Sequence, residues 1–453
     1  MNENGPETTA ATESGGAPPL DAWLGFQLST MMFLQYAIWG AWLPILFPFL
    51  QGHRGFTPEQ IGDMFAVGAV GAIIAPFVAG QIADRWFNTE RFLGLSHILG
   101  AVLVWQLGGL ESYGSFLTFS LLYSLIYSPT LSLTNSLAFH HLPDRDRDFG
   151  RIRLWGTIGW IVVGIGVGQL LYHAHSPADL SGSALKAAQD AGRADAFRLS
   201  AILGVILGIF CFLLPRTPPQ KSQEKSATLA ALREIRANPL LTLFLVAVPV
   251  SCVHQFYFVH ASEFLSSFQR NLSGVSTTIN RLFGAGGGGV MTIGQISEIA
   301  VLAILPFVAK KVSRKSLLAV GLSAYAVRMF LFGFVDAIPL PTVVTLLLGV
   351  SLHGLCFGCF MFVAFLIVDE ECTNDVKASA QSLFNLVVVG IGIIVGSKVA
   401  LWVHQLASTG DQLNYRTLFS YPMWASLACL VAVLSFYPGN RRNPSQHGET
   451  RGA

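Results

Sequence analysis

The chain has 453 residues, of which 28 are Lys or Arg and 26 are Asp or Glu, so that 12% are charged. Soluble domains carry about 25% charged residues, so this low value excludes an ordinary soluble protein. The net charge of +2 is too small to favour nucleic acid as a partner. Helices of about 20 residues cross a bilayer, and twelve of them would use up most of this chain. The composition therefore predicts an all-α integral membrane protein with twelve transmembrane helices.

Apolar stretches follow one another along the chain in two groups of six. Residues 1–22 are rich in Thr, Gly, Pro and Glu, and we expect them to form a disordered cytoplasmic tail. They lack the basic start of a signal peptide. Residues 23–214 then form an N-terminal six-helix bundle and residues 240–437 a C-terminal six-helix bundle. Between them, residues 215–239 are the longest polar break and are predicted to form a cytoplasmic central loop. Residues 438–453 form a second cytoplasmic tail.

The loops differ in positive charge, and this difference sets the orientation of a multi-pass protein. Loops and tails on the side of the two termini hold 19 Lys and Arg residues, whereas those on the other side hold 7. Cytoplasmic loops carry the excess of Lys and Arg. Both termini are therefore expected in the cytoplasm, with the chain embedded in the lipid bilayer.

The loop after the second apolar stretch carries a recognisable motif. It reads Gly80-Gln-Ile-Ala-Asp84-Arg85 and continues to Glu90-Arg91. This resembles the loop signature of the major facilitator superfamily, G-x-L-A-D-R followed by basic residues. The resemblance implies that Gly80, Asp84 and Arg85 latch the cytoplasmic ends of helices. A charged turn without that role is the alternative.

Motifs that would indicate an enzyme are missing from the sequence. The spacing of Cys356 and Cys359 suits a metal or redox pair, but the chain has no second pair, so packing thiols are the better interpretation. Gly284 and residues 286–289 form a glycine run, yet no Gly-Lys-Ser/Thr follows it, as a phosphate loop requires. We interpret the run as a flexible start of the eighth span. No enzyme activity, cofactor or metal is expected.

Ionisable groups inside membrane spans are costly, so each one is a candidate for function. Glu298 is the strongest, because it lies in mid-span and shares a helix face with Gln295, three residues earlier. Such a carboxylate can take up a proton on one side and release it on the other. Helix packing is its alternative role, and Arg328 and Lys398 can snorkel to the interface. The remaining candidates, of which the histidines can also be neutral packing residues, are Arg153, His254, His260, Glu263 and His353.

Polar and aromatic residues at helical spacing predict a substrate site. Arg153, Thr157 and Trp160 fall at i, i+4 and i+7 of the fifth span and so share one face. A cation, a hydroxyl and an aromatic plane suit a polar ligand with a flat ring. Packing or anchoring at the membrane interface is the alternative for the aromatic residues. Further candidates are Gln35, Trp39 and Trp42 on the first span, Gln255 on the seventh, and His353 and Phe357 on the tenth.

Five short motifs, found from the first span to the eleventh, carry a family resemblance. They are Phe33-Leu-Gln-Tyr-Ala-Ile-Trp-Gly-Ala-Trp42, Ser128-Pro-Thr-Leu-Ser-Leu-Thr-Asn135, Ile152-Arg-Leu-Trp-Gly-Thr-Ile-Gly159, Gln295-Ile-Ser-Glu298 and Lys377-Ala-Ser-Ala-Gln381. Through them the chain resembles the bacterial nucleoside:proton symporter family of the major facilitator superfamily. The resemblance implies a monomeric inner-membrane transporter that imports nucleosides with protons by alternating access. It also implies that Glu298 couples proton movement and that nucleoside is bound by Arg153, Thr157, Trp160, Gln255, Gln295 and Phe357.

Three positions depart from the family pattern. Phe258 stands where relatives often have Asn, Gly358 where they often have Asp, and His353 where Tyr is common. Without that Asp, proton coupling would rest on Glu298, assisted by His353. Without the Asn, a ribose or base loses a donor and an acceptor. The alternatives are therefore a porter for another polar solute, such as a sugar or a nucleoside-like metabolite, and a membrane sensor that binds solute without moving it.

Overall fold

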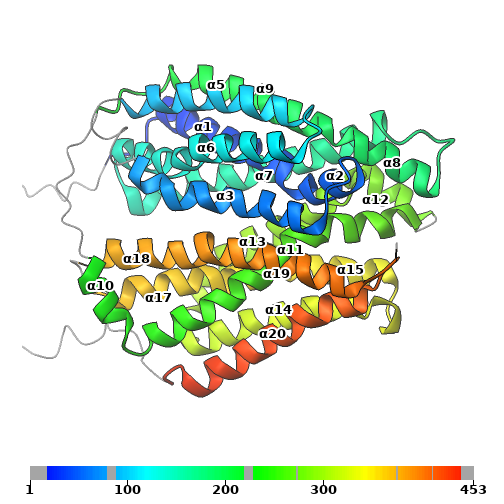
Figure 1. Cartoon of the computed structure of the whole chain (residues 1–453). Coiled ribbons are helices and arrows are strands. Elements are labelled where there is room, and N and C mark those ends of the chain that lie inside the picture. The colour runs from blue at the N-terminus through cyan, green and yellow to red at the C-terminus, as the bar shows by residue number, and fades with distance from the viewer. Residues whose placement is uncertain are drawn as a thin grey trace, which may run out of the picture.

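The computed structural model describes residues 18–78, 88–218, 228–271, 274–373, 376–410 and 412–439, and they are almost entirely helical (Figure 1). Among these residues, ten helical segments are long and apolar enough to cross a membrane. The all-α membrane class is therefore confirmed. The predicted latch residues Gly80, Asp84 and Arg85 lie outside the described residues.

The N-terminal half is the upper layer in Figure 1. Its elements are α1 (Ala22–Trp42), the 3-10 helix η1 (Leu43–Ile45), α2 (Leu46–Gly52), α3 (Pro58–Val78), α5 (Thr89–Leu107), α6 (Tyr113–His141), α7 (Arg145–Ala174), α8 (Gly182–Gly192) and α9 (Ala194–Cys211). Within it α1 packs against α7 and α9, α3 against α6, and α5 against α9. Polar side chains cap the helices: Asp21 accepts a hydrogen bond from the backbone N–H of Leu24, and Asp144 accepts one from that of Arg147.

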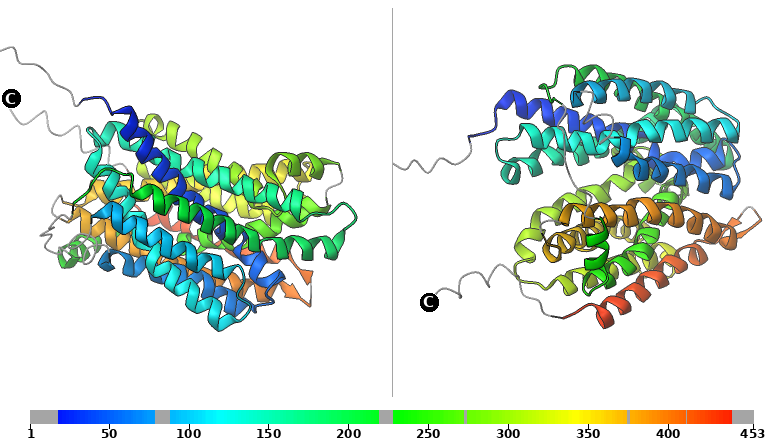
Figure 2. Two further views of the ribbon diagram at one scale, coloured as in Figure 1. Left: turned by 90° about the horizontal axis from the view of Figure 1, so that it is seen from above. Right: turned by 60° about the vertical axis from the view of Figure 1, so that its left-hand side comes forward.

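The C-terminal half is the lower layer, and Figure 2 shows the same two layers from another side. Its helices are α10 (Thr228–Ile235), α11 (Leu240–Asn271), α12 (Val275–Phe283), α13 (Gly288–Val308), α14 (Arg314–Gly333), the 3-10 helix η3 (Val335–Ala337), α15 (Thr342–Ser351), α16 (His353–Cys356), the π-helix η4 (Phe357–Phe362), α17 (Val363–Glu371), α18 (Lys377–Asn385), the π-helix η5 (Leu386–Ile391), α19 (Gly392–Ala407) and α20 (Tyr415–Phe436). The strands β1 (Ser408–Thr409) and β2 (Gln412–Leu413) pair antiparallel between α19 and α20. Within this half α14 packs against α20 and α11 against α19. Helix α10 lies inside the segment predicted as a loop, so that part of residues 215–239 is helical.

The exposed side chains of both halves are suited to contact with lipid. Large apolar groups such as Leu245, Phe307 and Trp424 are more than half exposed, which in a bilayer places them against acyl chains. Inside, small residues let helices approach closely: a Cβ on Gly94 of α5 would lie 3.0 Å from the carbonyl oxygen of Gly208 on α9. The chain thus packs as membrane bundles do.

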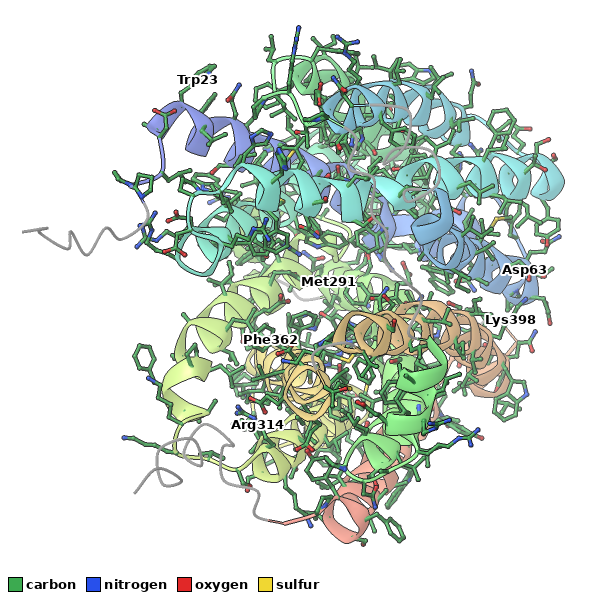
Figure 3. All side chains as sticks on the ribbon, turned by 90° about the vertical axis from the view of Figure 1, so that its left-hand side faces the viewer. Trp23, Asp63, Met291, Arg314, Phe362 and Lys398 are labelled. Carbon is green, nitrogen blue, oxygen red and sulfur yellow. The ribbon has the colours of Figure 1, made fainter. Side chains whose placement is uncertain are left out.

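The two halves touch along α3 with α19 and along α7 with α13. Asp63 of α3 pairs with Lys398 of α19 and also accepts a hydrogen bond from Tyr113. Figure 3 shows Asp63 and Lys398 next to each other across the boundary between the layers, where Met291 of α13 also lies. Gln51 of α2 lies 3.2 Å from His404 of α19. These contacts lie toward the end of the molecule opposite to the start of α1 and the end of α20 (Figure 1).

The glycine run forms part of the same contact. It leads into α13 as predicted, but residues 284–290 are buried, and the backbone N–H of Ala285 donates to the carbonyl of Gly168 on α7 across 2.9 Å. Gly287 has a positive φ of 81°, and a Cβ there would lie 1.9 Å from the carbonyl oxygen of Ser262. The run is therefore tightly packed, and its interpretation as a flexible segment is wrong for this conformation, because only glycine backbone fits in the space.

Candidate functional site

Glu298 lies on α13 where this helix faces the N-terminal half. Its side chain is 15% exposed, and Oε2 lies 3.6 Å from Nε2 of His353, the first residue of α16. Arg153 of α7 belongs to the other half and lies near enough to Glu298 for their opposite charges to interact. The guanidinium of Arg153 stacks on the ring of Tyr36, with Cζ 4.0 Å from the ring centroid. The two ionisable residues singled out in the sequence therefore face the same junction, one from each half.

Aromatic rings form a continuous wall at this junction. Trp39 of α1 meets Trp160 of α7 edge to face, with ring centroids 5.4 Å apart. Trp160 meets Phe258 of α11 at 6.5 Å, which carries the wall from the N-terminal half into the C-terminal half. Phe258 in turn lies 6.0 Å from the ring of His353. Such a wall offers edges and faces to a flat ring.

Glycines of the first and fifth spans explain how Trp160 reaches the junction between the halves. A Cβ on Gly159 of α7 would lie 2.1 Å from the carbonyl oxygen of Phe33, so α1 and α7 touch through backbone. The indole of Trp160 rests on Gly40 of α1, where a Cβ would lie 2.9 Å away. Thr157, one turn before Trp160, is partly buried on the same helix. The stripe predicted from spacing is thus built on close helix packing.

Several predicted site residues use their polar groups within their own half. Gln35 is completely buried, donates to the hydroxyl of Thr130 across 2.8 Å and accepts from Thr134 at 3.2 Å. Gln255 donates to the hydroxyl of Ser397 across 3.1 Å. Gln35 is therefore not brought to the Glu298 cluster, although it lies one turn from Trp39 on α1.

Two other predicted residues lie close to the cluster. Gln295 is buried one turn before Glu298, and its Oε1 has no hydrogen-bond partner among the described residues. Phe357 begins the π-helix η4 and lies 6.4 Å from the ring of His254. Both add to the side of the junction formed by the C-terminal half.

Arg328 belongs to the cluster, and the snorkelling weighed for it as an alternative does not describe its contacts. It is completely buried rather than extended to the interface, and its Nη1 donates to Nδ1 of His353 across 3.0 Å. Its Cζ lies 3.7 Å from the ring centroid of Tyr257. A sequence signal did exist, because Arg328 lies three residues after Tyr325 on one helix face, and its Cζ lies 5.6 Å from that ring.

The other ionisable residues of the spans have partners away from this cluster. Glu263 pairs with Arg270 at 3.1 Å and with Lys186 at 3.5 Å. His260 is buried, and its Nε2 lies 3.2 Å from the carbonyl oxygen of Ala400. Lys398 pairs with Asp63, as described above, so snorkelling does not describe its contacts. Within the described ranges, no group of three or more His, Cys, Asp or Glu side chains is placed to hold a metal ion.

Comparison with known proteins agrees with this geometry. The family described as "Nucleoside H+ symporter" matches residues 23–442. The putative nucleoside transporter YegT of Escherichia coli is 31% identical over 418 residues, which cover 90% of this chain and 91% of YegT. The xanthosine permease of the same organism is 26% identical, over 91% of this chain and 95% of the permease.

A crystal structure of the nucleoside transporter NupG superposes with a TM-score of 0.77 at 25% identity, over 91% of this chain and 98% of that one. A bacterial homologue of the lysosomal transporter Spinster shares the fold, with a TM-score of 0.65 at 15% identity. The match to the family covers nearly the whole described chain and confirms the resemblance found in the motifs. The protein belongs to the nucleoside H+ symporter family and has the fold of the major facilitator transporters.

Proposed function

We propose that the chain imports nucleosides together with protons by alternating access. The observation that carries this proposal is the junction between the halves, where Glu298 lies beside His353 and the aromatic wall crosses from Trp160 to Phe258. Secondary transporters bind substrate and coupling ion near the midplane, between two bundles that rock against each other. A carboxylate on that boundary can link proton binding to the contact between the bundles.

The proposed membrane arrangement has twelve spans in two bundles of six. Helices α3, with 21 residues, and α5, with 19, are long enough to cross the membrane and complete the ten candidate spans. The excess of Lys and Arg places both termini in the cytoplasm. The contacts of Asp63 with Lys398 and of Gly168 with Ala285 then close the outer side. Gly80, Asp84 and Arg85 are proposed as a latch on the inner side, and the transporter as a monomer.

The proposed substrate site is the aromatic wall and the polar groups beside it. Trp39, Trp160 and Phe357 supply rings for a nucleobase. Oε1 of Gln295, which has no partner in the described part of the chain, can accept from a sugar hydroxyl or a base N–H. Gln35 is assigned a supporting role, holding α1 against α6 behind this face. The other proposed binding residues are Arg153, Thr157, Gln255 and His353.

Charge explains how a proton changes the contact between the halves. When Glu298 is ionised, its negative charge attracts the guanidinium of Arg153, which lies in the other half. When Glu298 is protonated, this attraction between the halves is lost. Proton binding therefore alters the relative stability of the two access states, which is the requirement for coupling.

The test is uptake of labelled uridine in vesicles with and without an imposed pH gradient. Glu298→Gln should abolish accumulation against a gradient and leave exchange partly intact, because an amide cannot release a proton. Asp369→Asn is the matched control, since Asp369 is an exposed carboxylate paired with Lys377. Arg153→Ala should weaken uridine binding. Unchanged accumulation in Glu298→Gln would contradict the proposal, and unchanged affinity in Arg153→Ala would remove Arg153 from the site.

A porter for another polar solute is the second candidate. Phe258 favours it, because an apolar ring stands in the middle of the wall where relatives often place an amide. Competition of labelled uridine uptake by unlabelled nucleosides and sugars separates the two candidates. Competition by a sugar but not by nucleosides would favour the second.

A further inference from the structure

Arg328 brings a full positive charge into the core of the C-terminal half. Within the described part of the chain, no carboxylate oxygen lies within 4.0 Å of its guanidinium. Its contacts are the rings of Tyr257 and Tyr325 and the Nδ1 atom of His353, while its Nε and Nη2 have no hydrogen-bond partner among the described residues. A buried cation that stays charged acts strongly on whatever lies next to it. His353 contacts both Arg328 and Glu298 and so connects Arg328 to the proposed site.

The contact between Arg328 and His353 decides which ring nitrogen carries the hydrogen. A guanidinium has only donors and does not lose its proton in proteins. Nδ1 of His353, 3.0 Å from Nη1, must therefore accept. A neutral imidazole that accepts at Nδ1 carries its hydrogen at Nε2. Nε2 is the atom that faces Oε2 of Glu298, at 3.6 Å.

We propose that Arg328 keeps His353 neutral with its Nε2–H turned toward Glu298, so that His353 positions this carboxylate and does not carry the transported proton. The inference rests on the proposed function and assigns the proton to Glu298 alone. The O–H bond of protonated Glu298 breaks on release to water, and no N–H bond of His353 forms or breaks. Arg328 is thus a positioning residue that acts through His353.

A second proton on His353 is disfavoured by its surroundings. Protonation at Nδ1 would point a new N–H at the guanidinium that now donates to that atom. Two cations would then share a space that is closed by the rings of Tyr257 and His254, which stack on His353 at 5.5 and 5.6 Å. Burying two adjacent like charges is costly. Arg328 would have to move away before His353 could accept a proton.

The other titratable groups around Arg328, His353 and Glu298 come from four helices. They are Arg153 on α7, His254 and Tyr257 on α11, Tyr325 on α14 and Cys356 on α16. Nδ1 of His254 lies 2.7 Å from the hydroxyl of Tyr325, so that this histidine is already engaged. Arg153 is the cation in this group, and it belongs to the N-terminal half. None of these contacts supplies a carboxylate that would offset Arg328.

The decisive variant is His353→Gln. An amide offers Arg328 a carbonyl oxygen and Glu298 an N–H, yet it has no titratable site. His353→Leu removes both interactions and is the matched control. We expect the pH profile of uridine uptake to be the same in His353→Gln as in the unsubstituted protein. His353→Leu, which also removes the acceptor of the Arg328 hydrogen bond, should accumulate about tenfold less uridine than His353→Gln, the usual effect of losing a hydrogen bond to a charged group.

Arg328 supplies an independent readout. Arg328→Lys keeps a charged donor and should leave the pH profile of uptake unchanged. Arg328→Met frees Nδ1 to take a proton, and it should add a second titration to that profile. This series also decides the matter if His353→Gln does not reach the membrane, because an unchanged profile in Arg328→Met would overturn the inference.

The outcomes distinguish the inference from the proposed function. If Glu298→Gln keeps accumulation, the proposed function fails. If Glu298→Gln abolishes accumulation and His353→Gln abolishes it as well, with exchange of uridine still intact in both, His353 carries the proton and only the inference fails.

Discussion

Replacing Gly168 by Ala tests whether the halves close where the glycine run meets α7. A Cβ on Gly168 would lie 2.4 Å from the carbonyl oxygen of Phe283 and 3.2 Å from Cα of Gly284, both in the C-terminal half. At Gly166, two residues earlier on the same helix, none of the described residues comes within 4 Å of the corresponding Cβ position. Gly166→Ala is therefore a control with the same chemistry and no clash.

The size of the effect follows from the overlap. Contacts of a Cβ below 3.0 Å essentially do not occur, so the halves must separate by about 0.6 Å, the difference from 2.4 Å. The hydrogen bond from Ala285 N–H to the Gly168 carbonyl lengthens with this separation. Overpacking of this kind costs about 1–3 kcal/mol. Because the clash exists only while this end is closed, the population of the closed state should fall about 5- to 150-fold relative to the open one.

Alkylation of a reporter cysteine measures this population. Thr292 of α13 is buried against α7, where a Cβ on Gly164 would lie 2.8 Å from its Cγ2. In a Thr292→Cys background, an impermeant maleimide added outside right-side-out vesicles should label Gly168→Ala faster than Gly166→Ala. Equal labelling rates in the two variants would refute the reasoning, because the added methyl group would then not act on closure.

Further variants probe the pairing of Asp63 with Lys398 and the core of the N-terminal half. Asp63→Asn or Lys398→Met should weaken closure by at most about 1 kcal/mol, because the two side chains are 37% and 48% exposed. The exchanged pair D63K/K398D should restore closure in the same labelling assay. If the exchanged pair does not label more slowly than the single variants, the two residues do not pair directly. Gln35→Leu removes two hydrogen bonds, while Thr130 and Thr134 each keep one to a backbone carbonyl. At about 0.5–1.5 kcal/mol for each bond, the purified protein should be destabilised by about 1–3 kcal/mol, seen as a lower thermal unfolding temperature, while uridine affinity stays within about threefold. A large loss of affinity at unchanged unfolding temperature would instead place Gln35 in the binding site.

Features that depend on the chain's own periodicity could be predicted from the sequence. Apolar stretches long enough to span a bilayer are visible residue by residue, and the helices follow them. Glu298 and Arg153 stood out for the same reason, because a charge in an apolar stretch is rare. The family resemblance, which came from short motifs such as Gln295 to Glu298, was confirmed over residues 23–442.

Features that depend on contacts between helices could not be predicted. Arg328 and His353 are 25 residues apart, and no local pattern shows that one donates to the other. A lone Arg in a span is compatible with snorkelling, and only the burial between Tyr257 and His353 excludes it. Gln35 shares a helix face with Trp39, yet its amide satisfies two threonines of α6, because spacing gives direction around one helix but not depth in the bundle.

The buried guanidinium of Arg328 also bears on how the chain is made. An Arg at the centre of a membrane helix costs about 2.5–3.5 kcal/mol during insertion by the translocon, and Arg328, which lies nearer to the end of α14, carries part of this cost. Its side chain is completely buried in the folded protein and does not reach the membrane surface. The ring of Tyr257 comes from α11, which is synthesised before α14, whereas His353 comes from α16, which is synthesised after it. When α14 is synthesised, Tyr257 is therefore already present and His353 is not. The later packing of α16 against α14 then completes the surroundings of Arg328.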